Sequence, residues 1–312
     1  LTTRHDLARW RGELGDAAGA AAAFAEVLAD RERVLGSDHP QTLTTRHDLA
    51  RWRGELGDAA GAAAAFAEVL ADRERVLGPD HPQTLTTRHD LAHWRGMAGD
   101  TFGTSAALAE TLEAMERLLG RDHPRTLAAR ADLALWRGKT ANAAWSVHAY
   151  GELLDDMLRV LGPEHPDTLA TRDSHANWRG TAGDVEGAAA ELAELLPDQE
   201  HVLGADHPQT LMTRHSLARW RGEAGDADGA ARALAELLED MVRVLGPDHL
   251  RTLAVRLDHA HWHGEAGDIA GAAHLLGKLL EDMVRVLGPD HPRVVTARQE
   301  LRWRETGAGE PG

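Results

Sequence analysis

A 42-residue period runs through the chain and constrains its fold more than any other feature. Residues 1–42 and 43–84 are identical except that Ser37 is replaced by Pro79. The same frame recurs at 85–126, 127–168, 169–210, 211–252 and 253–294, and a partial copy follows at 295–304. A constant period of this size predicts a solenoid, in which each unit buries its apolar face only against its neighbours. We therefore expect one elongated body over residues 1–304, with 295–304 as a capping helix and 305–312 as a flexible tail.

Composition narrows the classes of function. The formal charge of −16 disfavours general affinity for nucleic acids. The absence of cysteine excludes disulfides and thiolate metal sites, and it fits a reducing compartment such as the cytoplasm. A membrane span is not expected, because Glu68 interrupts the alanine-rich stretch 59–71. The chain starts without Met or a signal-peptide pattern, so we expect an excised fragment, and its many Arg, Ala and Gly residues resemble an actinobacterial coding bias.

Each repeat is expected to form two helices. The first, helix A, begins at the proline of the Asp-His-Pro linker, for example Pro82, with the Asp or the His as its N-cap. A Gly-Asp pair such as Gly57-Asp58 ends it, because glycine readily adopts the left-handed conformation. The second, helix B, carries apolar residues at helical spacing and ends at a glycine such as Gly78. Two helices and two short turns account for the whole period, and no segment alternates like a strand.

This pattern resembles the tetratricopeptide repeat in its 42-residue version, which occurs in kinesin light chains and in the sensor regions of bacterial nucleotide-binding signalling proteins. The residues that carry the resemblance are Leu49, Ala50, Gly57, Asp58, Ala62, Phe66, Val69, Leu70 and the linker from Gly78 to Pro82. The resemblance implies an all-α, right-handed superhelical solenoid of helix-turn-helix repeats. It also implies that helices A line a concave groove that binds peptides or proteins.

A few positions depart from the repeat. Ala141-Asn142 replace the Gly-Asp turn, and Leu250 replaces the linker proline. Pro197 falls inside helix B of residues 169–210 and predicts that this helix kinks or ends near Leu196. The partial copy at the end carries Trp303 one residue early.

One tryptophan recurs in each repeat. The ladder consists of Trp10, Trp52, Trp94, Trp136, Trp178, Trp220, Trp262 and Trp303. It could stack bases or bind proline-rich ligands. The interpretation we favour is that each indole fills the seam between adjacent helices A, because a ligand seldom needs every repeat alike.

Histidines recur beside Asp in the linkers, once per repeat, at His39, His81, His123, His165, His207, His249 and His291. Because neighbouring copies lie a full repeat apart, helix capping explains them better than metal binding. A separate pair, His259 and His263, has the i, i+4 spacing that zinc sites use. No metalloprotease motif accompanies it. His259 occupies the position that Leu49 holds in its repeat, as does His175, so we favour semi-buried histidines at these two positions, which would make the C-terminal half sensitive to mild acid.

A ladder of arginines also follows the repeat, at Arg4, Arg46, Arg88, Arg130, Arg172, Arg214, Arg256 and Arg298. Phosphate binding is one interpretation. Each repeat also carries acidic residues such as Asp48 and Asp72, so ion pairing between repeats is the plainer prediction.

The resemblance implies that the fifth, ninth and thirteenth residues of each repeat face the groove. These positions vary, with His, Arg and Glu towards the ends and an apolar patch at Ala131 and Leu135. The candidate peptide contacts are His5, Arg9, His47, Arg51, His89, His93, Arg130, Leu135, Asp173, Asn177, His215, Arg219 and His261. Such a groove would favour an acidic segment, and the alternative is an ordinary solvated face.

These observations predict a non-enzymatic scaffold that binds a protein or peptide, by resemblance the sensor region of a larger signalling protein. No catalytic motif, cofactor site or metal site is expected, because no nucleophile elbow, no zinc-protease motif and no complete phosphate loop occurs. The alternative is a self-association module. On that hypothesis the chain is a monomer or a closed dimer through residues 1–42, where Leu7 and Trp10 lack a covering helix.

Overall fold

A computed structural model describes residues 1–14, 16–140, 143–289 and 291–306. The described residues form fifteen helices and no strand, and 84% of the chain is helical. Helices A are α1 (Thr2–Glu13), α3 (Pro40–Glu55), α5 (Pro82–Met97), α7 (Pro124–Thr140), α9 (Pro166–Thr181), α11 (Pro208–Glu223) and α13 (Leu250–Glu265). Helices B are α2 (Ala17–Leu35), α4 (Ala59–Leu77), α6 (Thr101–Leu119), α8 (Ala143–Val160), α10 (Val185–Val202), α12 (Ala227–Leu245) and α14 (Ile269–Leu287). The predicted all-α solenoid of two-helix repeats is confirmed.

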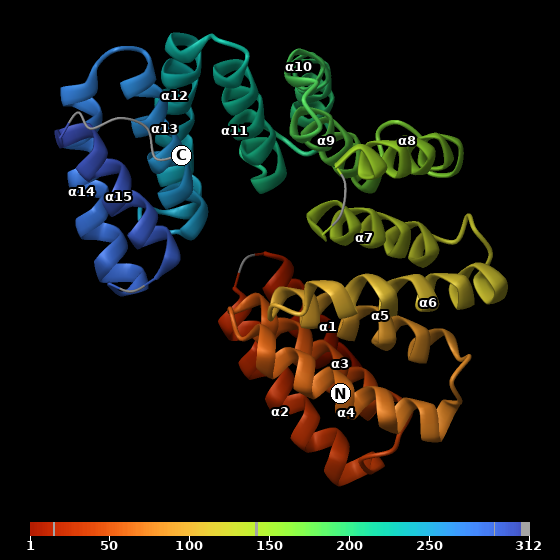
Figure 1. Ribbon diagram of the computed structural model, residues 1–312. Helices are drawn as coiled ribbons and strands as arrows, with labels where there is room; N and C mark the ends of the chain where they lie inside the picture. Colours follow the sequence, from red (N-terminus) through yellow and green to blue (C-terminus); the bar gives the residue numbers. More distant parts are fainter. Residues whose placement is uncertain (15, 141–142, 290, 307–312) are drawn as a thin grey trace. The chain divides into compact units, whose positions relative to one another are not determined.

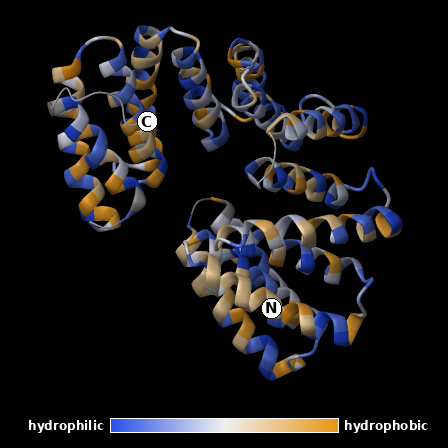
Figure 2. Cartoon of the chain, in the orientation of Figure 1, coloured by the Kyte–Doolittle hydropathy of each residue, from blue (hydrophilic) through white to orange (hydrophobic). Residues whose placement is uncertain are grey.

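The chain divides into two compact units, Leu1–Asp156 (unit 1) and Met157–Gly312 (unit 2). Within each unit, most consecutive helices pack side by side in sequence order (Figure 1). Apolar and polar residues occupy different faces of the helices (Figure 2), as expected for stacked amphipathic elements. A last helix, α15 (Pro292–Thr306), extends beyond the predicted cap at 295–304 in both directions. The expected tail at 307–312 and the substituted turn at Ala141-Asn142 lie outside the described residues.

Local sequence sets the helix ends. The linker histidine is the N-cap of helix A, which settles the choice between Asp and His. Its Nδ1 accepts a hydrogen bond from the backbone N–H two residues later, at 3.1–3.2 Å in all seven linkers. Helix B is capped by the Asp of the Gly-Asp turn, where Asp58 Oδ1 accepts from the Gly61 N–H at 2.8 Å. Gly57 before it has φ of 100°, a conformation that other residues rarely adopt.

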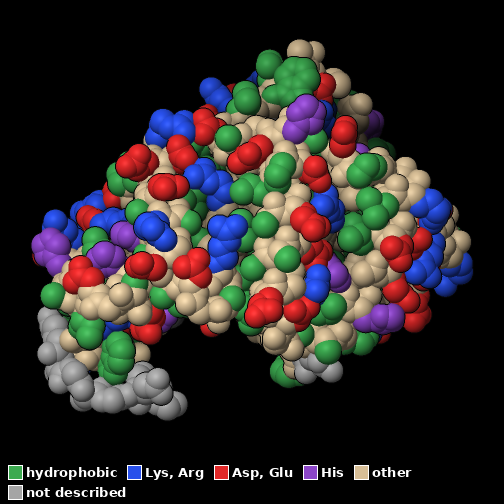
Figure 3. All heavy atoms as spheres, turned by 90° about the horizontal axis from the view of Figure 1, so that it is seen from above, with side chains coloured by type: hydrophobic (Ala, Val, Ile, Leu, Met, Phe, Trp, Pro, Cys, Tyr) green, Lys and Arg blue, Asp and Glu red, His purple; other side chains and the backbone are tan. Residues whose placement is uncertain are grey.

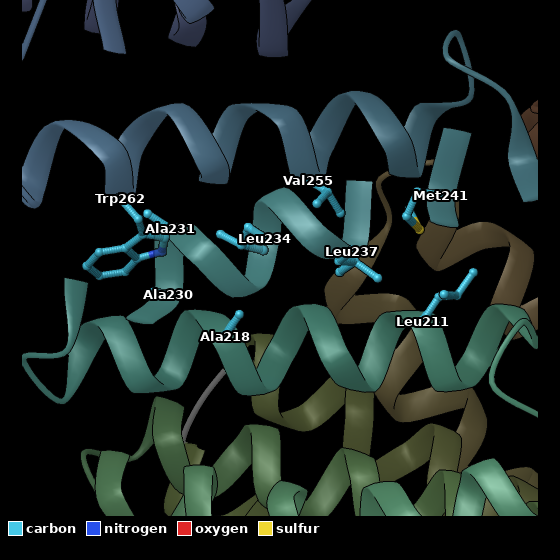
Figure 4. Packing of buried hydrophobic residues seen from close by; sticks show 9 residues of the cluster. All are labelled: Leu211, Ala218, Ala230, Ala231, Leu234, Leu237, Met241, Val255 and Trp262. Atoms are coloured by element: carbon cyan, nitrogen blue, oxygen red, sulfur yellow. The ribbon is translucent and has the colours of Figure 1, made fainter. Parts of the chain in front are cut away.

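Within each unit, the core of a repeat lies between its own helices and helix A of the next repeat in that unit. In unit 2, residues from α12 such as Leu234 and Leu237 point between α11 and α13, where they meet Leu211 and Val255 (Figure 4). In unit 1, Phe66 of α4 is fully buried in the corresponding position. This burial of one repeat by the next makes the stack continuous within a unit.

Five of the eight tryptophans are seam residues, as predicted. Each of these five indoles rests on a glycine of the preceding helix A, so closely that a Cβ at that glycine would overlap the ring. We call this contact the Trp–Gly seat. The pairs are Trp52 on Gly12, Trp94 on Gly54, Trp136 on Gly96, Trp220 on Gly180 and Trp262 on Gly222. At most 8% of each of these tryptophans is exposed, so they are core residues and not a base-stacking ladder.

The prediction that helix B ends near Pro197 is wrong. Helix α10 continues through Pro197 to Val202. Pro197 is exposed, so its ring and its missing N–H disturb only the solvent-facing side of the helix. Leu195 and Gln199, on either side of it, are fully buried and hold both halves of the helix against the core. Packing therefore outweighs the local preference of proline.

Candidate binding surface on helices A

The ninth residue of several repeats lies over the indole of the tenth. The guanidinium carbon of Arg51 is 5.6 Å from the centre of the following tryptophan ring, and that of Arg219 is 4.3 Å away. His93 and His261 approach their neighbouring indoles edge-on, with ring centres 5.4 and 4.9 Å apart. We call the set of ninth residues the ninth-residue row; it comprises Arg9, Arg51, His93, Leu135, Asn177, Arg219 and His261. In this arrangement, the arginine guanidinium groups lie over indole rings that are themselves buried, and the guanidinium side is the one nearer the surface.

The fifth residues lie deeper than the sequence suggests. His5, His47, His89 and His215 have side chains only 11–13% exposed, between adjacent helices A. Each Nε2 faces the carboxylate of the sixth residue in the next repeat, at 2.6–3.0 Å. Burial acts to lower the pKa of His47 and of His89, but contacts with two Asp carboxylates outweigh it and raise both. The structure therefore places these predicted contacts inside the stack.

Asp173 and Asn177 are also engaged within unit 2. Asp173 Oδ1 accepts from the Thr213 hydroxyl at 2.7 Å, and Oδ2 accepts from the Asn177 amide at 3.1 Å. Asn177 Oδ1 in turn accepts from the Trp220 Nε1–H at 2.9 Å. Burial raises the pKa of Asp173, although both hydrogen bonds oppose this. This network joins α9 to α11 and leaves Asn177 partly exposed.

Arg130 is another predicted contact that the structure buries. Its Nη1 lies 2.7 Å from Asp156 Oδ2, and 9% of the side chain is exposed. Most of the arginine ladder pairs in the same way: Arg46 pairs with Asp72 and Arg214 with Asp240, from helix A to helix B of one repeat.

The prediction that the ladder pairs between repeats is therefore wrong for most of its members. Arg88 is the exception: it pairs with Glu74 of the preceding repeat, because Ala114 replaces the aspartate of its own helix B. Pairs between repeats come from another arginine near the end of helix B. Arg75, for example, donates to both carboxylate oxygens of Asp38 in the preceding linker.

Among the predicted groove positions, the accessible ones are therefore the ninth-residue row and part of the thirteenth residues. Arg51 and Met97 are exposed in unit 1, and Glu223 and Glu265 in unit 2. Acidic and basic side chains are interspersed on the face drawn in Figure 3. A partner would meet alternating charges with an apolar residue such as Met97 between them, not a field of one sign.

A hollow of about 640 Å³ opens on the outer face of α1 and α2. Leu7, Trp10 and Leu14 line it, with Arg4 and Glu26 at its border. Trp10 is 54% exposed, whereas the equivalent Trp52 is 7% exposed. The side of α3 that carries Trp52 is covered by the preceding repeat, whereas the corresponding side of α1, which carries Trp10, is exposed.

His259 and His263 lie side by side, with ring centres 5.8 Å apart. Burial, followed by the charge of His263, lowers the pKa of His259. His263 Nε2 contacts Asp268 at 3.0 Å. Within the part of the chain that the structure describes, no group of three or more candidate metal ligands comes together.

None of the described helices is long and apolar enough to cross a membrane.

Sequence reasoning missed the partners of the fifth residues. From the sequence alone, Asp48 is expected to pair with the arginine ladder, and Asp90 and Asp132 have no expected partner, although a His-Asp doublet recurs at the fifth and sixth residues of the first three repeats. That doublet was the available signal. A second missed residue is Arg304, which takes the position of the indole in the last Trp–Gly seat, over Gly264.

Solved structures similar to this chain share its architecture. A putative kinesin light chain of Podosopora anserina with nearly identical repeats is 25% identical, with a TM-score of 0.52 over 64% of this chain and 95% of that one. BtubC from P. vanneervenii is 16% identical, with a TM-score of 0.58 over 72% of this chain and 91% of that one. A signal transduction ATPase from Pyrococcus horikoshii with a tetratricopeptide repeat sensor is 11% identical, with a TM-score of 0.60 over 96% of this chain and 44% of that one. No curated protein sequence matches the chain significantly.

Family profiles match most of the repeats. One profile described as tetratricopeptide repeat matches residues 1–74, and a second with the same description matches 84–125, 210–251 and 252–293. These matches follow the 42-residue frame and cover more than half of the chain. Together with the two-helix repeats and their seams, they establish that the chain belongs to the tetratricopeptide repeat family.

Proposed function

We propose that the chain is a non-enzymatic scaffold that binds a protein or peptide along the ninth-residue row. Tetratricopeptide repeat chains are generally scaffolds for protein–protein interaction. The observation that carries the proposal is the stacking of Arg51 and Arg219 on buried indoles. A guanidinium held on a rigid ring loses less conformational freedom on binding than a free one, so it is a prepared contact for a carboxylate.

The favoured ligand is an extended or helical peptide with an acidic segment. Arg51 and His93 on neighbouring helices A would contact its carboxylates, while Leu135 and Met97 would contact apolar side chains. The buried fifth residues and Arg130 would act from behind, by fixing the helices that carry the row.

The test is binding of a fluorescent acidic peptide and of its uncharged amide counterpart, beside capture of partners from the source cells. Arg51→Glu with Arg219→Glu should weaken the acidic peptide at least tenfold, with unchanged helix content. The matched control is Arg53→Glu with Arg221→Glu, which makes the same charge change on exposed positions two residues further along the same helices. Equal effects of the two double variants, or tight binding of the uncharged peptide, would remove the acidic-ligand proposal.

We also propose that the repeats are the sensing part of a larger signalling protein. This rests on the repeat type, and the coding sequence that flanks the repeats tests it. An adjoining nucleotide-binding domain is the expected result, and flanks that encode no further domain would contradict it.

A second candidate function is self-association through the open face of α1 and α2. The exposed Trp10 and the hollow beside it favour it. Two such faces would form a closed dimer. Sedimentation over a concentration series should then detect a dimer that Trp10→Glu removes, and a monomer at every concentration excludes this function.

A further inference from the structure

Alternating imidazoles and carboxylates cross the helices A of unit 1. Nε2 of His5, His47 and His89 lies 2.8, 2.8 and 3.0 Å from the carboxylate of the next repeat. Those carboxylates belong to Asp48, Asp90 and Asp132. We call these six residues the imidazole–carboxylate ladder. Asp6, 3.7 Å from His5, and His93, 3.5 Å from Asp132, stand at its two ends.

Both ring nitrogens of the two inner histidines face carboxylate oxygens. His47 Nδ1 lies 3.5 Å from Asp48, and His89 Nδ1 lies 3.1 Å from Asp90, in addition to their Nε2 contacts. A neutral imidazole carries one N–H, so one of its two nitrogens would turn a lone pair towards an anion. An imidazolium carries two, and both contacts become attractive. The Nε2 contacts of His47 and His89 are close but poorly aligned as hydrogen bonds, so attraction between opposite charges is what favours them.

Charge balance favours the same protonation state, with His5 and His93 as the other imidazoles beside these carboxylates. Asp6 and the three ladder carboxylates contribute four negative charges. The cations facing them from helices B are the buried Arg31 and Arg73, whose Nη1 groups donate to the carbonyl oxygens of Gln41 and Gln83. Two positive charges are therefore lacking in a region where uncompensated charge is costly. Protonation of His47 and His89 supplies them.

Unit 2 offers an internal comparison. Its fifth residues are Asp173, His215 and Leu257, and among them the ladder contact is made by His215, whose Nε2 lies 2.6 Å from Asp258. The sixth residues Ser174 and Ser216 carry no charge. The described part of unit 2 thus has one pair of this fifth-and-sixth-residue type, where unit 1 has a connected series; other imidazole–carboxylate contacts in unit 2, such as His175 with Glu191 at 2.8 Å and His261 with Glu300 at 3.1 Å, do not connect to that pair.

We propose that the imidazole–carboxylate ladder is a pH-sensitive device, in which His47 and His89 are imidazolium ions at neutral pH and their deprotonation loosens unit 1 but not unit 2.

The direction in which the stability of unit 1 changes with pH follows from the difference between the folded-state and unfolded-state pKa values of the two histidines. Burial opposes the charged form, but contacts with Asp132 and Asp90 outweigh it and raise the pKa of His89 to about 10. The pKa of His47 is raised in the same way by Asp48 and Asp90. A raised folded-state pKa gives stability that is complete below about pH 6.5 and is lost as the pH rises towards the folded value. The folding equilibrium constant should then fall up to about tenfold per pH unit for each imidazolium.

At low pH, the stability of unit 1 depends on the ladder carboxylates. Burial acts to raise the pKa of Asp48, but contacts with His47 and His5 lower it to about 2. Its contribution is present above about pH 4 and is lost as the pH falls towards 2. The ladder therefore stabilises unit 1 most between about pH 4 and pH 6.5, and its response in mildly alkaline solution distinguishes it from an ordinary histidine switch.

The direct test is nitrogen-15 NMR of the histidine rings in the unmodified chain from pH 5 to pH 10. His47 and His89 should keep two protonated ring nitrogens at pH 8. Neutral rings for both at pH 7.5 would overturn the proposal, whatever the behaviour of any variant.

Hydrogen exchange followed by mass spectrometry provides the second readout. Amide protection in unit 1 should fall between pH 7 and pH 10 relative to unit 2, after correction for intrinsic exchange rates. His89→Gln should weaken that dependence by about one tenfold step per pH unit, whereas His148→Gln, at a side chain 75% exposed in the same unit, should leave it unchanged. A parallel decline of both units, or an unaltered dependence in His89→Gln, contradicts the proposal.

Discussion

The Trp–Gly seat predicts that replacing one glycine by alanine destabilises the chain although alanine favours a helix. Gly54 lies inside α3, and an idealised Cβ there would stand 2.5 Å from two ring carbons of Trp94. Ordinary carbon contacts are about 3.5–4.0 Å. Trp94 is 8% exposed and packs against Ala62 and Phe66, so the ring has little room to retreat.

The magnitude follows from two opposing effects. Alanine stabilises an interior helical position by about 1 kcal/mol relative to glycine. Overpacking of a filled core costs about 1–3 kcal/mol, and two ring carbons in overlap indicate the upper part of that range. Gly54→Ala should therefore destabilise unit 1 by about 2 kcal/mol. The matched control is Gly277→Ala in α14, where a Cβ would meet no atom within 4 Å, and it should stabilise unit 2 by about 1 kcal/mol.

Urea unfolding followed by circular dichroism measures both changes, and hydrogen exchange assigns each to its unit. Combining Gly54→Ala with Trp94→Leu should remove the penalty of the alanine, because the overlapping ring atoms are gone. The seat as described is refuted if Gly54→Ala stabilises the chain as much as Gly277→Ala does.

Three further predictions concern helix ends and the proline. Pro197→Ala should stabilise unit 2 by about 1–3 kcal/mol, because a proline inside a helix costs about 3 kcal/mol relative to alanine; a loss of stability in urea unfolding would contradict this. His81→Ala should cost about 1 kcal/mol and speed exchange in the first turn of α5, whereas His81→Asn, which keeps a cap acceptor, should not; equal effects would show that the cap is not responsible. Arg304→Ala should expose α15 to exchange at a cost of about 3 kcal/mol, because it empties the buried seat over Gly264 and removes one of the contacts of Glu300, whose carboxylate also meets His261. Arg304→Trp should keep α15 protected, and an undisturbed α15 in Arg304→Ala would contradict this account.

The elements that were predictable from sequence are those fixed by local signals. Pro82 and the glycines at 57 and 78 mark helix boundaries within a turn of where they occur, because each acts through its own backbone geometry. The recurrence of tryptophan indicated a seam, since an indole needed in every repeat serves the stack. Pro197 failed as a boundary because burial of distant side chains, which the local sequence does not reveal, holds its helix together.

The candidate surface was less predictable, because it depends on how one repeat lies on the next. His5 and His47 look like solvent-facing polar residues when one helix is considered alone. They become buried because the next helix A presents an aspartate 43 residues further along the chain. Arg130 also looks like a solvent-facing residue when helix A is considered alone. It is buried because helix B of the same repeat presents its partner, Asp156. Only the superposition of helices separates these residues from the exposed ninth-residue row.

The Trp–Gly seat also bears on how such a chain changes length during evolution. The copies at 43–84, 85–126 and 211–252 each present an indole on one side and a glycine on the other, so a unit inserted or deleted beside them meets neighbours that already fit it. A duplication in frame therefore requires no compensating change at the new junction. Residues 1–42 and 43–84, which still differ at a single position, are what a recent event of this kind leaves behind.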